Sequence, residues 1–476
     1  MQGNAEGSAG KIFVAGRDCN ADLAGPSGPW AERRGRRTAF DPDLNSSEAR
    51  RGEPSSPWAF IKGSRTLVVS RRNPLFAINR STDTVEDAPV TATVDLAALR
   101  HNARILQDWA GETELMAVIK ADAYGHGILP VARTLRDEGI RHFGVARLAE
   151  GIHLREQGHT ARILVLGAPS PAKIPHYVDH DLDLTVSSAD IAAAVVRHAR
   201  PGAPIRVHVK VDTGMGRLGL SPEDVSAVVS RLTQTSGVHL AGLWTHFATA
   251  DAPGSAFAQT QLDRFQAVVE DLDGAVEHVH AANTGALLTI GEPAHDFSPS
   301  LIRSGIGLYG LAATPELSAR LNLRPAMQLT ARVTQLKTVP AGTPISYGAR
   351  WQAPHRTRIA TLGAGYGDGY PRLCSGRATV RLGGAGCPVV GTICMDMCMV
   401  DLGPPDQSPA TRVERGDEAI LFGPSGPTVY DVAQWSETIP YEICCGVSPR
   451  VPRRYVDPKE ESESALHAAQ VSTSEV

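Results

Sequence analysis

The chain has 476 residues, a hydrophobic content of 42% and a formal net charge of -4. This length allows about two to three domains with cores of their own. The slightly negative net charge provides no basic surface for a nucleic acid, so we expect no nucleic-acid partner. No apolar run is long enough to cross a membrane, so we expect a cytoplasmic protein without a membrane partner. The 7 cysteines show no CxxC pair or zinc-finger spacing, so we predict a reduced compartment and no metal.

The two ends of the chain differ from its middle. Residues 1–88 are rich in Gly, Ser, Pro and Arg without a sustained apolar period, which predicts a disordered extension. A short apolar patch at 66–69 could pair as a strand. This extension is either a regulatory arm or the product of an upstream start codon, and the sequence leaves both open. Residues 457–476 are polar, and we expect a mobile tail.

Residues 89–324 alternate short apolar runs with amphipathic stretches of helical period, which predicts βα units. Eight such units favour a (β/α)8 TIM barrel. A doubly wound sheet is the alternative, but no GxGxxG follows the first strand. The expected strands are 115–120, 142–146, 162–167, 182–186, 205–212, 240–246, 278–282 and 301–308, and the expected helices include 130–137, 189–199, 222–233 and 259–272.

Residues 325–456 have a different texture, with short strand-like runs separated by Gly and Pro. We expect strands at 332–339, 358–362 and 378–382, and a helix at 429–435. The stretch therefore predicts a second, mainly β domain.

Lys120 is the first candidate for chemistry. It follows the apolar run Ala117-Val118-Ile119 and precedes Tyr124, which lies between small residues and glycines. Burial at the end of a strand disfavours an ammonium charge, so a fraction of free amine could condense with an aldehyde. A lysine that merely caps a strand is the ordinary alternative.

Further polar motifs follow the later barrel strands, where TIM-barrel active sites form. The seventh and eighth strands lead into groups that can bind phosphate, a hydroxyl at Thr284 and backbone N–H groups at Gly305 and Ile306. Each motif alone is a weak signal, but their joint order along the chain is specific. The other candidates are Arg217 in a Gly-rich turn, His246, Asn283 and Arg303.

From about Thr93 to Tyr455 the sequence resembles the alanine racemases, and the run around Lys120 is similar to their cofactor-lysine motif. The resemblance implies that Lys120 binds pyridoxal 5'-phosphate covalently and that Tyr124 contacts its phosphate. It also implies that Arg303 faces the pyridine nitrogen, with His246 bonded to this arginine. An arginine does not give up its proton, so the ring would be a poor electron sink and side reactions would be restrained.

Inversion of a stereocentre needs a base on each face of the substrate. Lys120 would serve one face, and Tyr347 matches the family's second base. The resemblance implies that Tyr347 acts through a relay to His246 and Arg303. It also implies that Tyr347 comes from the second subunit of a homodimer with shared active sites. Met395 and Asp396 would line the same substrate pocket from the partner.

Four further residues have roles that the resemblance implies. Arg217 would meet the cofactor's phenolic oxygen and the substrate carboxylate, and Lys210, if carbamylated, would orient Arg217. An ordinary charged strand residue is the alternative for Lys210. Tyr366 and Arg372 match the corridor through which substrate enters.

The sequence also departs from the family at two positions. Pro449 stands where many members carry a tyrosine that reaches the phosphate, and Thr392 stands where some carry a corridor arginine. Neither departure touches the two bases. The sequence thus predicts a racemase that interconverts L-alanine and D-alanine for peptidoglycan, or else a serine or broad-specificity racemase, or a carrier of pyridoxal phosphate.

Overall fold

The computed structural model describes residues 87–457 except 253, 273, 275 and 290–299. The predictions made for residues 1–86 and 458–476 lie outside the described residues. Two eight-stranded sheets account for most of the strands described. One is parallel and forms the barrel, and the other is mainly antiparallel, which confirms the predicted fold class.

The barrel sheet has the strand order β8-β7-β6-β5-β4-β3-β2-β9, and every pairing in it is parallel. The seam between β8 and β9 closes the barrel through an isolated bridge between Asn283 and Arg303 and a hydrogen bond from Ser300 N to Val279 O. The strands are β2 (Glu114–Val118), β3 (His142–Val145), β4 (Arg162–Val165), β5 (Asp183–Val186), β6 (Ile205–Lys210), β7 (Val238–Trp244), β8 (His278–His280) and β9 (Leu301–Ser304).

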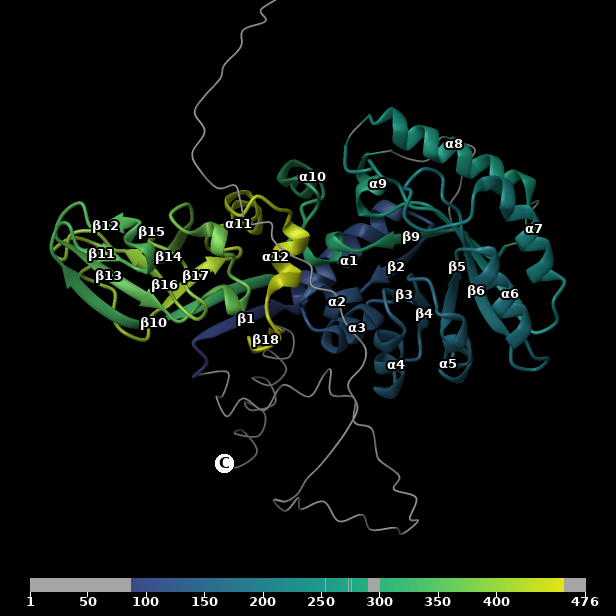
Figure 1. Cartoon of the computed structure of the whole chain (residues 1–476), viewed down its shortest axis with the longest axis horizontal. Helices are drawn as coiled ribbons and strands as arrows, with labels where there is room; N and C mark the ends of the chain where they lie inside the picture. Colours follow the sequence, from purple (N-terminus) through teal and green to yellow (C-terminus); the bar gives the residue numbers. More distant parts are fainter. Residues whose placement is uncertain (1–86, 253, 273, 275, 290–299, 458–476) are drawn as a thin grey trace, which may run out of the picture. The chain divides into compact units, whose positions relative to one another are not determined.

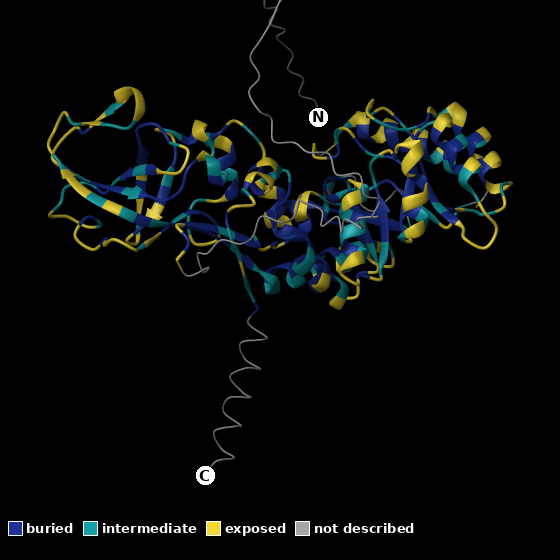
Figure 2. Ribbon diagram, turned by 60° about the horizontal axis from the view of Figure 1, so that its bottom comes forward, coloured by how far each residue is buried: buried dark blue, intermediate teal, exposed yellow. Residues whose placement is uncertain are grey.

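Helices surround these strands (Figure 1). Their inner faces are buried and their outer faces exposed (Figure 2). The helices and 3-10 turns of this part are α1 (Leu96–Ala110), α2 (Lys120–Tyr124), α3 (Ile128–Asp137), α4 (Leu148–Glu156), η2 (Pro171–Lys173), α5 (Ile174–Asp179), α6 (Ala189–His198), α7 (Pro222–Thr233), α8 (Ala256–Asp271), α9 (Thr284–Thr289), η3 (Ile306–Tyr309) and α10 (Pro315–Arg320).

Helix α7 shows the physical basis of the apolar period that predicts a helix at 222–233. Pro222 stands at its first position, where the missing N–H costs nothing. Its buried residues are Val225, Val228, Val229 and Leu232, at the i, i+3, i+4 and i+7 spacing of one helical face. The predicted strand 301–308 is too long, because β9 ends at Ser304 and a 3-10 turn follows.

The second sheet is organised around β10, a long strand that pairs with β1, β13 and β17. The elements of this part of the chain are β1 (Val90–Asp95), β10 (Met327–Val339), β11 (Pro344–Ile345), η4 (Tyr347–Ala349), β12 (Trp351–Gln352), β13 (Thr357–Leu362), η5 (Tyr366–Asp368), η6 (Arg372–Cys374), β14 (Thr379–Leu382), β15 (Ala385–Val390), β16 (Cys398–Asp401), β17 (Glu418–Phe422), α11 (Val429–Trp435), α12 (Pro440–Gly446) and β18 (Arg453–Val456). Strands β11 and β12 form a separate two-stranded sheet.

One boundary of the predicted barrel is wrong. Residues 89–324 were assigned to it, but β1 pairs with β10 and β18 in the second sheet. The barrel therefore follows β1, and its first helix is α1. The six residues of β1 do not indicate by themselves which strand they pair with, because strand pairing depends on residues that are distant in sequence.

The chain returns to the barrel near its end. The Arg453 guanidinium donates from Nε to the carbonyl of Gly125, just after α2, and β18 lies parallel to β1. In the part of the chain that the structure describes, no helix combines the length and the apolarity needed to span a bilayer.

Candidate active site at the carboxyl ends of the barrel strands

Lys120 lies two residues beyond β2, at the start of the short turn α2. The next four residues, Ala121 to Tyr124, all have φ between 53° and 54°, in the left-handed region. This conformation costs L-residues about 1–2 kcal/mol each, so surrounding contacts must hold it. Glu150 accepts the N–H of Ala121 at 2.7 Å, and Asp122 accepts the N–H of Ile128 at 2.7 Å.

The surroundings of Lys120 favour the uncharged, nucleophilic form of its amine. Burial lowers its pKa from the usual value, and the Arg217 guanidinium lowers it further. Cys445 and Glu150 act in the opposite direction. The prediction from the strand-end position thus agrees in direction with the lowered pKa.

The groups expected to hold a phosphate converge beside Tyr124. A methyl group added at Gly305 would lie 2.4 Å from the Tyr124 hydroxyl oxygen, so this phenol rests against the Gly305 backbone. The N–H of Gly305 donates to the Thr284 hydroxyl at 3.2 Å. Ile306 opens the η3 turn immediately afterwards. Tyr124, Thr284, Gly305 and Ile306 therefore form one polar cradle that a larger side chain would fill.

Arg303 is buried, and backbone carbonyls fix its guanidinium. One terminal nitrogen donates to His280 O at 2.8 Å, and the other donates to Thr245 O at 2.7 Å and Ala281 O at 2.9 Å. His246 lies at the edge of hydrogen-bonding range, with its Nδ1 3.5 Å from Arg303. Burial lowers the pKa of Arg303 to about 9, and burial followed by the Arg303 charge lowers the pKa of His246 to about 2. At neutral pH the arginine is charged and the histidine is neutral.

A chain of side chains runs from Arg303 into the barrel interior. Arg303 lies 3.0 Å from His280 Nδ1, His280 Nε2 lies 3.0 Å from His208 Nδ1, and His208 Nε2 lies 3.3 Å from the Asp183 carboxylate. All four side chains are buried.

Every hydrogen bond in this row of four side chains is donated in the same direction, from Arg303 toward Asp183. A guanidinium only donates, so His280 Nδ1 must accept. Burial holds the pKa of His280 well below its usual value, so the ring is neutral and its proton lies on Nε2. His208 Nδ1 must then accept in turn, which places the His208 proton on Nε2, facing Asp183. The carboxylate thus terminates the chain and selects the tautomer of both rings.

Lys210 is only 2% exposed, and its ammonium nitrogen lies 3.6 Å from the centre of the Trp244 ring. Burial, followed by the charges of Arg303 and Arg217, lowers the pKa of Lys210 to about 6. Its amine is therefore mostly uncharged at neutral pH. Arg303 lies 4.9 Å from the same Trp244 ring.

Asn283 has a local structural role, because its side chain accepts the N–H of Ala286 at 2.8 Å at the start of α9. Its backbone forms the bridge to Arg303 that closes the barrel.

Tyr347 lies in the η4 turn, between the strands β11 and β12 of the two-stranded sheet, and is 73% exposed. Its backbone oxygen accepts the Thr392 hydroxyl at 2.9 Å. Thr392 thus supports the Tyr347 turn. Among the described residues, no hydrogen bond joins Tyr347 to His246 or Arg303 within one chain.

Four further candidates, Tyr366, Arg372, Met395 and Asp396, lie in the same domain as Tyr347, whereas Arg217 lies in the loop after β6 of the barrel. The backbone N–H groups of Tyr366 and Gly367 donate to the carbonyls of Cys394 and Met395, so the corridor turn and the Met395 loop are joined. Asp396 pairs with Arg450 at 2.9 Å, while Arg372 lies in η6.

Sequence reasoning missed His280, His208, Asp183 and Trp244. Strand periodicity places these residues inside a barrel, but it does not say which of them touch. The only local signal was the alternation of polar residues along these strands, with His208 between Arg206 and Lys210 in β6 and His280 two positions after His278 in β8.

Known proteins resemble this chain over both of its domains. The family model described as the alanine racemase N-terminal domain matches residues 94–313, and the model of the alanine racemase C-terminal domain matches residues 326–455. The alanine racemase of Desulforamulus reducens is 41% identical over 375 residues, covering 77% of this chain and 99% of that protein. The alanine racemase of Symbiobacterium thermophilum is 41% identical over 374 residues, with 77% and 97% covered.

Solved structures are similar over the same region. The alanine racemase from D-cycloserine producing Streptomyces lavendulae has a TM-score of 0.71 and 37% identity, covering 79% of this chain and 98% of that one. The alanine racemase from Bacillus anthracis with bound L-Ala-P has a TM-score of 0.70 and 31% identity, covering 78% and 95%. The chain therefore belongs to the alanine racemase family.

Proposed function

We propose that this protein interconverts L-alanine and D-alanine with pyridoxal 5'-phosphate bound at Lys120. The observation that carries the proposal is the pairing of two groups at one end of the barrel. These are an amine with a lowered pKa on a left-handed turn, and a buried guanidinium held by fixed acceptors.

The residues present fit this cofactor. Lys120 offers the amine, and the cradle beside Gly305 and Ile306 offers the Tyr124 and Thr284 hydroxyls as donors for a phosphate, while the Gly305 N–H holds the Thr284 hydroxyl in place. When bound, the cofactor supplies a carbonyl carbon for amines and an electron-withdrawing ring.

Arg303 would face the pyridine nitrogen. Its two terminal nitrogens are engaged by carbonyls and histidines, while Nε has no partner among the contacts of the described residues. The Nε–H group is thus the donor left for a ring nitrogen, and a guanidinium keeps that proton. This arrangement restrains reactions other than racemisation.

Lys120 and Tyr347 would hold and return the α-proton on opposite faces of the substrate. Arg217 would bind the substrate carboxylate, and a carbamylated Lys210 would orient Arg217. Lys210 supports this because an uncharged amine is the form that adds carbon dioxide.

Tyr347 would come from a second copy of the chain. Tyr347 and Met395, which is 54% exposed, present large apolar side chains to solvent. Hydrogen bonds hold the turns that carry both residues in place. Such exposure is typical of a surface that another protein covers. We therefore propose a homodimer with shared active sites, in which Met395, Asp396, Tyr366 and Arg372 line the approach to the pocket.

The test is to incubate the purified protein with L-alanine and to measure D-alanine by chiral chromatography. Both enantiomers should approach equal amounts from either starting side, and Lys120→Ala should lose activity together with the visible absorbance of bound cofactor. A parallel assay with L-serine measures specificity. An active Lys120→Ala protein would refute the assignment. In a cell, we propose a cytoplasmic enzyme that supplies D-alanine for peptidoglycan.

A further inference from the structure

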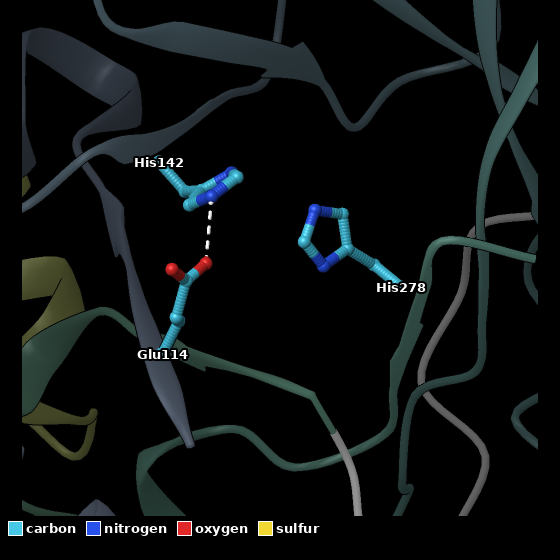
Figure 3. A group of neighbouring side chains, drawn as sticks. All are labelled: Glu114, His142 and His278. Carbon is cyan, nitrogen blue, oxygen red and sulfur yellow. Dashed lines mark ion pairs between the residues drawn. The ribbon is translucent and has the colours of Figure 1, made fainter. Parts of the chain in front are cut away.

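Three side chains that could bind a metal gather at the opposite end of the barrel from Lys120. Glu114, His142 and His278 are the first residues of β2, β3 and β8. The amino-terminal ends of parallel strands meet at one end of a barrel, so these residues come together although 164 positions (278 minus 114) separate the first from the last. Figure 3 shows the three side chains directed toward a common space.

Their donor atoms are close enough to share one ion. One donor atom from each residue lies within 4.8 Å of the others, and Glu114 Oε2 lies 2.9 Å from His142 Nε2. The two imidazole rings are 5.0 Å apart and nearly perpendicular, at 78°. A tetrahedral site with bonds of about 2.0–2.1 Å needs donors about 3.4 Å apart. Small rotations of the three side chains would move the Glu114 and His142 donor atoms slightly apart and bring the more distant donors closer.

The protonation states suit a cation. Burial lowers the pKa of His142 and also that of His278, which the neighbouring His142 lowers further. The Glu114 carboxylate acts in the opposite direction on both histidines. Glu114 is exposed, and its only ion-pair partner among the described residues is His142. A positive ion between the three would satisfy the carboxylate.

Nearby groups can support the two histidines. The Ser300 hydroxyl lies 3.4 Å from His278 Nδ1 and accepts the N–H of Val279 at 3.0 Å, which leaves His278 Nε2 for a ligand. Glu277 Oε1 lies 3.6 Å from His278 Nε2, but this carboxylate is already paired with His239 and Arg206 and lies outside the trio. The nearby guanidinium of Arg206 is paired with Asp183 and Glu277.

We propose that Glu114, His142 and His278 form a binding site for a divalent transition-metal ion of the zinc class. Two imidazoles and a carboxylate suit Zn²⁺, whereas Mg²⁺ and Ca²⁺ prefer oxygen donors. The sequence predicts no metal, because it lacks the short ligand spacings by which such sites are usually found. Here each ligand comes from a different strand.

The position of the site gives the ion a structural role. The strand order at this point is β8, β9, β2, β3, and the β8–β9 seam is where the barrel closes. His278 lies on one side of the seam, and Glu114 and His142 lie on the other. A metal bound to all three would brace the seam, and it would do so far from the groups proposed for racemisation.

The first experiment measures Zn²⁺ binding to the full-length holoenzyme by titration calorimetry, after treatment with a chelator and dialysis. We expect about one ion per chain. Glu114→Gln, His142→Gln and His278→Gln should each weaken binding at least tenfold, and Ser300→Ala about ten- to a hundredfold, as for residues that orient a ligand. Co²⁺ in place of Zn²⁺ should give visible ligand-field bands that the histidine variants lack.

The matched control is His239→Gln. His239 lies on the same end of the barrel and bonds to Glu277, but it is outside the trio, so its loss should leave Zn²⁺ affinity unchanged. All variants should keep bound cofactor and racemase activity, which verifies folding. The proposal is overturned if the wild-type protein binds no Zn²⁺, or if the trio variants bind it as tightly as the wild type.

A second measurement tests the role of the ion. An ion that binds only the folded barrel raises its melting temperature. Zn²⁺ should therefore raise the Tm of the wild type and of His239→Gln but not that of His278→Gln. Equal shifts in all three proteins would contradict a brace at the seam.

Discussion

At the scale of single residues, the active end of the barrel concentrates positive charge. After burial, the charges of Arg217 and Arg303 lower the pKa of Lys120, of Lys210 and of His246. No carboxylate touches the Arg303 guanidinium among the described residues. Asp183 instead reaches it through two histidines, and a carboxylate placed there favours the charge without blocking the face where a cofactor would lie.

We expect Asp183→Asn to lower racemase activity although it replaces a single heavy atom, because the carboxylate sets the tautomers of His208 and His280. The Asp183 oxygen facing Arg206 must remain an acceptor, so the new NH₂ group would face His208. Both ring protons would then move to Nδ1, and His280 Nδ1–H would oppose an Arg303 donor. We expect racemase activity to fall by about tenfold or more, as when a hydrogen bond to a charged group is lost.

The distinguishing measurement is ¹⁵N NMR of the histidine rings. The wild type should show Nε2–H tautomers for His208 and His280, and Asp183→Asn should show Nδ1–H. Asp181→Asn is the control, because Asp181 is an exposed neighbour that pairs with Arg162. Unchanged tautomers in Asp183→Asn would mean that the carboxylate does not set the direction of the chain.

Lys210 gives a prediction that depends on pH. Its pKa of about 6 lies below the usual 10.5, so the amine is free above pH 6 and becomes protonated as the pH falls through that value. With ¹³C-labelled bicarbonate, the holoenzyme should show a carbamate signal near pH 8 that fades below pH 6. Lys210→Met should lack the signal, and Lys337→Met, which removes an exposed lysine, should keep it. A signal that persists in Lys210→Met would place the modification elsewhere.

At the scale of elements, the left-handed turn after β2 is the unusual feature. Four successive non-glycine residues in this conformation persist because neighbouring elements leave little room for another path. A Cβ at Gly125 would lie 2.2 Å from the Cys444 carbonyl of α12, and one at Gly127 would lie 1.9 Å from the Tyr455 hydroxyl. The second sheet thus presses the Lys120 turn into place.

The cradle beside this turn can be tested by filling it. Gly305→Ala adds a methyl group 2.4 Å from the Tyr124 hydroxyl, so the phenol or the strand end must move. Cofactor affinity, measured by fluorescence titration of the apoprotein, should fall by about tenfold or more, an effect of roughly 1.4 kcal/mol, at the low end for overpacking. Gly446→Ala, which adds a methyl group in open space on α12, should bind as the wild type does. Equal affinities would remove Gly305 from the phosphate site.

At the scale of the whole molecule, Tyr347 and Lys120 belong to different sheets of one chain and share no hydrogen-bond path through His246 in the described residues. If Tyr347 acts across a dimer, two inactive proteins should complement each other. Mixing Lys120→Ala with Tyr347→Phe should restore up to about a quarter of the wild-type sites, since half the dimers are mixed and each has one intact site.

The mixing experiment needs verified subunit exchange, for example by native mass spectrometry of chains of different mass. Tyr347→Phe mixed with itself serves as the control and should remain nearly inactive. Absence of recovery in mixed dimers would argue that both bases come from one chain.

The sequence by itself determined the barrel and the β domain, because βα periodicity is local and side-chain alternation repeats along each strand. It also identified Lys120, Tyr124, Arg303 and Tyr347 as candidates, through short motifs whose order matches that of a known family. Where these residues lie relative to a second chain stays a prediction.

Tertiary structure alone decided which distant residues touch. Strand β1 joins the second sheet, His280 and His208 connect Arg303 to Asp183, and Glu114, His142 and His278 converge at the far end of the barrel. For β1 the physical reason is that strand pairing is a long-range choice, and for the two barrel clusters it is that barrel closure sets the contacts. It brings together the ends of strands that are remote in sequence, and no local pattern records which strand ends will face each other.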